Sequence, residues 1–238
     1  MYRQKTIIAG PLVAQAIYPM ATGSRGAVRS GRKKLSSDAQ RRMNLKYAWQ
    51  KLELLIAANF KRGDLWITLT YDDAHLPAAR KEAAARVQAF FDRLRKLRRR
   101  KGQDLRYLYC TEHKHGDGRW HHHVLIDRTG KDFADVLAAW GQGAVDIRTV
   151  RITKTKHLEA LARYMCKEAR DKVGHRLWSG SRNLRRPEIC TETVPETAEL
   201  RIPKGARKLD DSGDVRTMYG HYRYVKYLAR GWSGRIKQ

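Results

Sequence analysis

The sequence has few cysteines, few acidic residues relative to basic ones, and no long hydrophobic run. Its three cysteines, Cys110, Cys166 and Cys190, are well separated and form no CxxC pair, which argues against a zinc ribbon or a disulfide framework. No apolar stretch approaches the roughly 20 residues of a membrane helix. No GxxxxGK[ST] motif occurs, so a P-loop motor is excluded. We expect a cytoplasmic protein in a reducing compartment, without a membrane partner.

What the sequence has in excess is positive charge. The 238 residues contain 50 Lys and Arg against 24 Asp and Glu, a formal net charge of +26. Such an excess says little about the fold, but it indicates a polyanionic partner, and nucleic acid is the commonest one. Hydrophobic residues make up 42% of the chain, enough for a core of one main domain with attached segments, or of two small domains.

The composition suggests four segments along the chain. Residues 1–37 are expected to be a flexible basic arm, because residues 21–37 are rich in Gly, Ser and basic side chains and lack an apolar period. Residues 38–62 have the pattern of a helix, residues 63–187 form the main domain, and residues 188–238 are a C-terminal extension. The basic residues of the segment 21–37 are Arg25, Arg29, Arg32, Lys33 and Lys34.

The main domain reads as alternating strands and helices. The expected strands are 65–71, 105–112, 119–127 and 144–150, and the expected helices are 77–101, 131–140 and 154–172. This β-α-β-β-α-β-α order predicts an α+β fold of the ferredoxin-like, split βαβ type, with a central antiparallel sheet and helices packed on it. A late strand or a short helix is expected at residues 219–228.

The strongest local signal is the run Trp120-His121-His122-His123-Val124 in the third strand. Side chains alternate across a strand, so His121 and His123 share one face and His122 points to the other. Two imidazoles at this spacing can hold one metal ion from a single side, although a histidine-rich surface strand is the simpler alternative.

A third metal ligand is available at the end of the preceding strand. In an antiparallel hairpin, the Glu112 carboxylate reaches the same edge as the two histidines, while His113 and His115 in the connecting loop are rival ligands. Two His and one carboxylate leave coordination positions open for water and substrate, which is typical of catalytic rather than structural metal sites.

A second signal lies on the expected helix 154–172. Tyr164 falls at the boundary of its apolar stripe and Lys167 on the solvent side, and at i, i+3 both can face one substrate. A phenolic oxygen can attack phosphorus and hold it covalently if a metal or cation lies nearby, although a boundary tyrosine can also serve packing alone. The stripe comprises Leu158, Leu161, Ala162, Met165 and Ala169.

Three blocks stand in order in the chain: LWITLTY in the first strand, GRWHHHVLI in the third, and RYMCKEA in the helix. Together they resemble the HUH endonucleases, and more narrowly the rolling-circle replication initiators of small single-stranded DNA phages and plasmids. The resemblance covers residues 63–187, about half of the chain, and the His-x-His block with a following Tyr-x-x-Lys is its most specific part.

The resemblance implies a role for each matching residue. His121 and His123 match the metal-binding histidines, Glu112 matches a third acidic ligand, Tyr164 the nucleophile and Lys167 the lysine that follows it. The implied cofactor is a divalent metal, Mg²⁺ or Mn²⁺.

Two departures from the family pattern stand out. The family's middle residue is usually large and hydrophobic, whereas here it is His122, which leaves open a register in which His122 binds metal with His113 or His115. No second tyrosine follows Tyr164 within a helical turn or two, which argues against members that alternate two tyrosines on one helix.

The implied reaction is nicking of single-stranded origin DNA by tyrosine attack. It leaves a 5′-phosphotyrosine link and a free 3′-OH, which a host polymerase would extend after a host helicase opens the duplex in the bacterial cytosol. Four alternatives stay open: a tyrosine transposase or a relaxase of the same superfamily, a hydrolytic metal-dependent nuclease in which Tyr164 is structural, and a non-catalytic basic DNA-binding protein.

Two basic stretches are expected to contact DNA phosphates. In residues 93–101, seven of nine side chains are basic, more than a helix C-terminus requires for its dipole. The loop 174–187 adds further arginines and a tryptophan that can stack on an unpaired base. The expected DNA-binding residues are Arg93, Arg95, Lys96, Arg98, Arg99, Arg100, Lys101, Arg176, Trp178, Arg182, Arg185 and Arg186.

Overall fold

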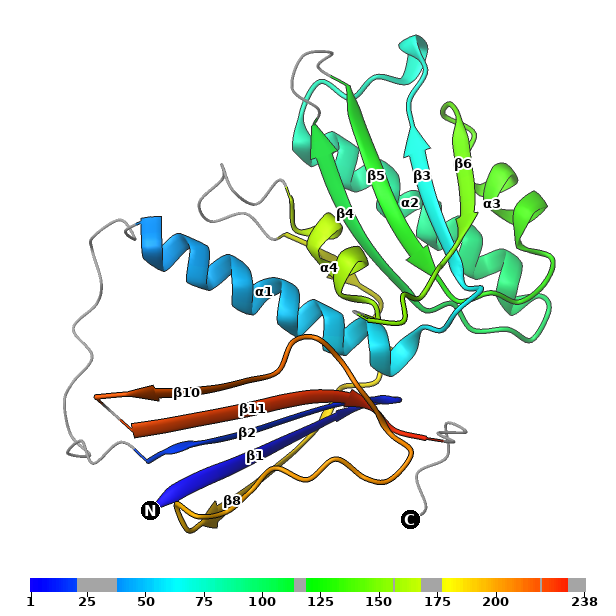
Figure 1. Cartoon of the computed structure of the whole chain (residues 1–238). Helices are drawn as coiled ribbons and strands as arrows, with labels where there is room; N and C mark the ends of the chain where they lie inside the picture. Colours follow the sequence, from blue (N-terminus) through cyan, green and yellow to red (C-terminus); the bar gives the residue numbers. More distant parts are fainter. Residues whose placement is uncertain (21–37, 114–118, 156, 168–176, 219, 231–238) are drawn as a thin grey trace. The chain divides into compact units, whose positions relative to one another are not determined.

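The computed structural model describes residues 1–20, 38–113, 119–155, 157–167, 177–218 and 220–230 (Figure 1). The chain divides into two compact units that interleave along the sequence. The first unit consists of Met1–Ala58, Thr153–His157 and Arg186–Gln238, and the second of Asn59–Ile152 and Leu158–Arg185.

The first unit is an antiparallel sheet that joins the two ends of the chain. Its strand order is β10-β11-β2-β1-β8, and the short β9 pairs with β11. The strands are β1 (Tyr2–Ala9), β2 (Leu12–Pro19), β8 (Glu188–Val194), β9 (Arg207–Lys208), β10 (Gly213–Thr217) and β11 (Gly220–Leu228). Helix α1 (Asp38–Asn59) is tied to β11 by Lys226, whose Nζ lies 2.8 Å from Glu53 Oε2.

The N-terminal residues correct the expectation of a flexible arm over residues 1–37. Strands β1 and β2 form a hairpin whose register runs from Tyr2 opposite Pro19 to Ala9 opposite Leu12. Gly10, with a φ of 60°, opens the two-residue turn, and glycine adopts this conformation without steric cost. The remaining basic segment, residues 21–37, lies outside the described residues.

The C-terminal residues likewise do more than extend the main domain. The described part of residues 188–238 contributes four strands to the first unit, and β8 pairs with β1 along seven residues from Glu188 to Val194. The late element expected at residues 219–228 is the strand β11. These pairings link residues almost 200 positions apart, which local sequence patterns do not reveal.

The second unit is an antiparallel sheet with helices on it (Figure 1). Its strand order is β6-β3-β5-β4-β7, where β3 is Leu65–Thr70, β4 Tyr107–His113, β5 Trp120–Ile126, β6 Val145–Thr149 and β7 Ser179–Gly180. Helices α2 (Arg80–Arg99) and α3 (Asp132–Trp140) bury Phe90, Phe91 and Trp140 against one face of this sheet. Helix α4 (Glu159–Met165) brings Tyr164 against the other face.

The predicted class is confirmed at the coarse level. The fold is mixed α+β with antiparallel sheets, and the described residues form four α-helices. The order β6-β3-β5-β4 inserts β5 between β3 and β4, which α2 connects. The finer ferredoxin-like assignment stays a prediction. None of the described helices is both long and apolar enough to cross a membrane.

The helix expected at residues 154–172 is shorter than predicted. It begins at Glu159, because the preceding residues form a turn closed by a bridge between Thr153 and His157, and His157 has a φ of 50°. The α-helix ends at Met165, and Lys167 follows one residue after the C-cap Cys166. Residues 168–172 of the expected helix lie outside the described residues.

Candidate metal and nucleophile site

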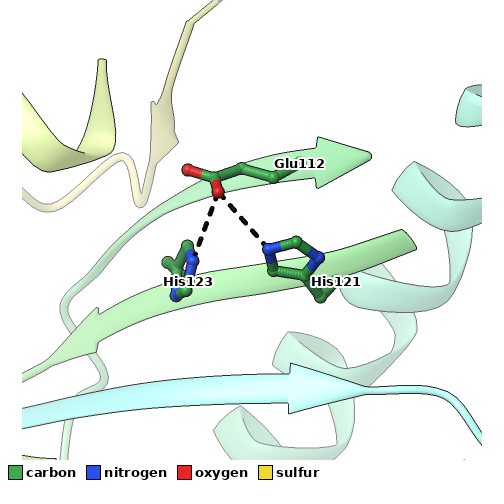
Figure 2. Close-up of side chains that lie close together, drawn as sticks. All are labelled: Glu112, His121 and His123. Atoms are coloured by element: carbon green, nitrogen blue, oxygen red, sulfur yellow. Dashed lines mark ion pairs between the residues drawn. The ribbon is translucent and has the colours of Figure 1, made fainter. Parts of the chain in front are cut away.

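Two neighbouring strands bring the predicted metal ligands together. Glu112 on β4 is the direct cross-strand partner of His121 on β5, and His123 projects from the same face (Figure 2). Glu112 Oε2 lies 3.3 Å from His121 Nε2 and 3.4 Å from His123 Nε2. One ligand atom from each of the three residues falls within 4.8 Å of the others, which a single ion can bridge.

The chemistry of these residues fits a divalent cation. The Glu112 side chain is only 2% exposed, and no described residue gives its Oε2 a hydrogen bond of good geometry. Burial alone would raise the pKa of the Glu112 carboxyl, but its interactions with His121, His123 and Lys167 outweigh burial and hold the pKa well below its usual range. A buried carboxylate that stays charged between two imidazoles is a suitable ligand for a metal ion.

His122 lies on the opposite face of β5 and is fully buried. Its Nε2 lies 2.7 Å from the Tyr71 hydroxyl and its Nδ1 lies 2.9 Å from Thr111 Oγ1. Burial lowers the pKa of His122 to about 3, so the imidazole is neutral. Both ring nitrogens therefore have partners away from the cluster, which disfavours the register with His122 as ligand. His115 lies outside the described residues.

Strand β3 supplies two supporting residues that the sequence reasoning missed. Thr68 is the cross-strand partner of His123, and its Oγ1 lies 3.2 Å from His123 Nδ1. The Trp66 ring stacks on the His123 ring at 5.3 Å with an interplanar angle of 11°. The alternation of LWITLT carried the signal, because Trp66 and Thr68 share a face with the two histidines.

Tyr164 and Lys167 converge on the same cluster. The Tyr164 hydroxyl lies 3.2 Å from His123 Nε2, and the ring meets Trp66 edge-on at 5.8 Å. Lys167 Nζ lies 2.9 Å from Glu112 Oε2 and 3.8 Å from the centre of the Tyr164 ring. Burial lowers the pKa of Lys167, but its interactions with Tyr164 and with the Glu112 carboxylate outweigh burial and raise it, so the side chain is a cation at neutral pH.

These side chains line a cleft of about 740 Å³ that opens to solvent. Tyr164, 41% exposed, is accessible from it. Arg119 and Arg148 also line the cleft, and each is paired with an aspartate, Arg119 Nη2 with Asp73 at 2.5 Å and Arg148 Nε with Asp146 at 2.8 Å. The site thus combines a buried set of potential metal ligands with an accessible hydroxyl and a lysine cation. These groups are suited to nucleophilic attack on a phosphodiester.

Not all of the expected DNA contacts are on the surface. Arg98 is fully buried, with Nη1 2.6 Å from Asp127 Oδ1 and Nη2 2.9 Å from Asp132 Oδ1. It cannot contact DNA, so its assignment as a DNA-binding residue is corrected. The sequence of the basic run does not distinguish two kinds of arginine. One that links α2 to the loop before α3 looks the same in sequence as one that faces a phosphate.

The other expected DNA contacts differ in their surroundings. Arg93 Nε donates to the Ala139 carbonyl oxygen at 2.7 Å, and Lys101 Nζ lies 2.5 Å from Asp135, so both link α2 to α3. Helix α2 packs on the sheet face opposite the metal ligands. Arg176 lies outside the described residues, and Trp178 is half-buried. The exposed members are Arg93, Lys96, Arg99, Arg100, Lys101, Arg182, Arg185 and Arg186.

The fold and the site define a class: an α+β protein that holds two histidines and a glutamate next to an accessible tyrosine. Residues 64–172, somewhat less than half of the chain, match a family model described as replication-associated protein, of the ORF2 type. This segment contains Glu112, His121, His123, Tyr164 and Lys167. The match supports a replication initiator. No curated protein and no solved structure gives a significant match.

Proposed function

We propose that this protein is a replication initiator that nicks single-stranded origin DNA and becomes linked to the 5′ end through Tyr164. The observation that supports the proposal is the 3.2 Å distance between the Tyr164 hydroxyl and His123 Nε2, because a hydroxyl at that distance from a potential metal ligand could act as the nucleophile. The family match to residues 64–172 supports the replication role, and the three sequence blocks support membership of the HUH endonucleases.

In the proposed reaction Tyr164 replaces the DNA 3′ oxygen on phosphorus. The phenol releases its proton to the solvent in the cleft, and its oxygen forms a bond to the scissile phosphorus. The bond from phosphorus to the 3′ oxygen breaks, and that oxygen takes up a proton to become a free 3′-OH. One phosphoester replaces another, so rejoining the strand requires no nucleotide cofactor.

His121, His123 and Glu112 would hold the divalent metal, Mg²⁺ or Mn²⁺. When bound, the metal polarises the scissile phosphate and neutralises charge that develops in the transition state. Lys167 contributes a fixed positive charge 3.8 Å from the Tyr164 ring centre, which stabilises the phenolate that attack requires. Trp66 keeps the His123 and Tyr164 rings in their mutual orientation.

The wider roles follow from this chemistry. The 3′-OH serves as a primer for a host polymerase, and the target must be unpaired, so a host helicase would open the duplex. A single tyrosine accounts for one strand transfer, and ending a round of replication needs a second subunit, a remote tyrosine or hydrolysis.

The ferredoxin-like, split βαβ assignment of the second unit fits the observed order β6-β3-β5-β4.

A covalent-adduct assay tests the proposal. The protein is incubated with Mn²⁺ and a labelled single-stranded DNA library of random sequence, and the products are separated on a denaturing protein gel. The expected result is a labelled protein band that disappears in Tyr164→Phe and persists in the control Tyr47→Phe, which alters an exposed tyrosine of α1. Nicking without a covalent band supports the hydrolytic alternative, and binding without nicking supports the non-catalytic one.

A further inference from the structure

A second cleft of about 720 Å³ lies on the other face of the sheet in the second unit. Helix α2, strand β4, strand β7 and the residues after β7 line it. Strand β4 contributes to both clefts, because Tyr107 and Tyr109 point into this one whereas Glu112 points to the metal ligands. None of the residues that line the second cleft belongs to the proposed catalytic cluster.

Three arginines from distant parts of the chain meet in this cleft. Arg95 and Arg99 come from the basic end of α2, and Arg182 follows β7. Arg95 Nη1 lies 2.5 Å from Asp92. Within the described ranges, Arg99 and Arg182 are exposed and neither has a carboxylate within 4.0 Å. One acidic residue, Asp104, also lines the cleft, so the balance of its charges is positive.

The inner wall of the cleft is rigid and amphipathic. The Tyr107 ring is stacked on Phe91 at 3.6 Å with an interplanar angle of 8°, and the Tyr109 hydroxyl accepts a hydrogen bond from Gln88 Nε2 at 2.7 Å. Gln103 and Asn183 bring side-chain amides to the lining. Both tyrosines are buried, so the cleft presents its guanidinium and amide groups to a nucleotide, and such groups bind phosphates and sugars.

We propose that this cleft binds backbone phosphates of single-stranded DNA away from the scissile phosphate, with Arg99 and Arg182 as the principal phosphate ligands. The proposal rests on the proposed function for the identity of the polyanion as DNA. A cleft of this volume is typical of small-molecule sites and would admit one or two nucleotides of an unpaired strand, but not a duplex.

The position of the cleft gives it a use in the proposed reaction. Tyr109 and Glu112 are three residues apart on β4, about 10 Å along the strand, and they face opposite sides of the sheet. Strand β7 forms the sheet edge beside β4 and has only two residues, Ser179 and Gly180. A DNA strand that passes around this short edge would meet the catalytic cluster on one side and the arginines on the other.

The test compares two pairs of substitutions that remove equal charge. Arg99→Gln/Arg182→Gln alters the cleft, whereas the control Lys96→Gln/Arg100→Gln removes two exposed cations of the same helix end that do not line it. Both pairs are made in Tyr164→Phe protein, so that DNA binding is measured without cleavage. Binding of fluorescent oligo(dT) and of a DNA duplex is followed by anisotropy over a range of NaCl concentrations.

The cleft pair is expected to weaken oligo(dT) binding about tenfold at low salt and to lower the salt slope by about 1.4, or about 0.7 for each lost phosphate contact. The control pair should have a clearly smaller effect, and duplex binding should change equally in both pairs. Equal loss of oligo(dT) affinity in both pairs, or a loss confined to the duplex, would overturn the proposal.

The outcomes separate this proposal from the catalytic one. If the cleft pair binds oligo(dT) normally while the protein with Tyr164 still forms a covalent adduct, the cleft proposal alone fails. If the cleft pair loses affinity but no adduct forms, the nicking proposal alone fails.

Discussion

The Tyr164 hydroxyl lies 3.2 Å from Nε2 of His123. That nitrogen is also 3.4 Å from Glu112 Oε2, so the proposed nucleophile and the potential metal ligands share a contact atom. Tyr164 comes from α4 and His123 from β5, and Trp66 contacts both rings from β3. In the proposed function, the orientation of His123 therefore affects both metal binding and the placement of the phenol.

Thr68 is expected to tune the metal site through His123. Its Oγ1 lies 3.2 Å from His123 Nδ1, and a hydrogen bond to the second nitrogen fixes the tautomer and the ring orientation of a metal-binding imidazole. Thr68→Val should weaken Mn²⁺ binding by about tenfold or more. The measurement is calorimetric titration of Mn²⁺ into Tyr164→Phe protein with and without the change.

Thr70→Val is the matched control for Thr68. Thr70 lies on the same strand and face, directly opposite His121, but its Oγ1 donates to the Ala144 carbonyl oxygen at 3.2 Å and not to an imidazole nitrogen. Its Mn²⁺ affinity should match that of the parent protein. Equal affinities in both valine variants would show that Thr68 has no such role.

His122 is expected to contribute to stability and not to metal affinity. His122→Leu removes hydrogen bonds to Tyr71 and Thr111 and leaves the buried Tyr71 hydroxyl with only a 3.4 Å contact to the Ala83 carbonyl oxygen, which should cost about 2–3 kcal/mol. In a double-mutant cycle with Tyr71→Phe, the double variant should lose less free energy of unfolding than the two single variants together, by about 1 kcal/mol. Urea unfolding measures both. A fall in Mn²⁺ affinity in His122→Gln would instead favour His122 as a ligand.

The site was more predictable from sequence than the fold around it. Strand alternation alone separates His121 and His123 from His122, and a hairpin brings Glu112 beside them, because both rules are local. The β1–β2 hairpin was not predicted, because the composition of the basic segment 21–37 led to all of residues 1–37 being interpreted as a flexible arm. The pairing of β1 with β8 could not be predicted from local sequence patterns, because it joins residues far apart in sequence.

Charge was the least reliable guide to individual residues. Arg98 and Arg99 are adjacent in one basic run, yet Arg98 is fully buried between two aspartates and Arg99 lies exposed at the second cleft. A helix turns about 100° per residue, so neighbouring cations point to different surroundings. Sequence gives the number of cations, and only the fold assigns each one to packing or to a ligand.

Arg98 is therefore expected to act on stability. Arg98→Met leaves Asp127 and Asp132 without their buried cation, and breaking such a network costs about 3–5 kcal/mol. Hydrogen exchange should show faster exchange in α2 and α3. The exposed neighbour Arg99→Met should change stability by less than about 0.5 kcal/mol. If the two variants are equally stable, the buried network does not support the fold as described.

His157 is expected to make the first unit sensitive to acid. Burial, together with the charges of Arg207 and Lys226, lowers the pKa of His157 from 6.5 to about 4. The unfolded chain therefore binds one proton more than the folded chain between these values, and stability rises with pH across this window. The contribution, at most about 3 kcal/mol, is complete above pH 6.5 and is lost as the pH falls towards 4.

His157→Asn tests this dependence with little backbone strain. The φ of 50° at this position is one that asparagine tolerates better than most residues, and the substitution removes the titrating imidazole. Hydrogen exchange of β2 and β11, corrected for the intrinsic effect of pH, should show that stability falls between pH 6.5 and 4 in the parent and falls less in the variant. An unchanged pH profile would mean that another group carries the acid sensitivity, because the imidazole is the only titrating group that this substitution removes.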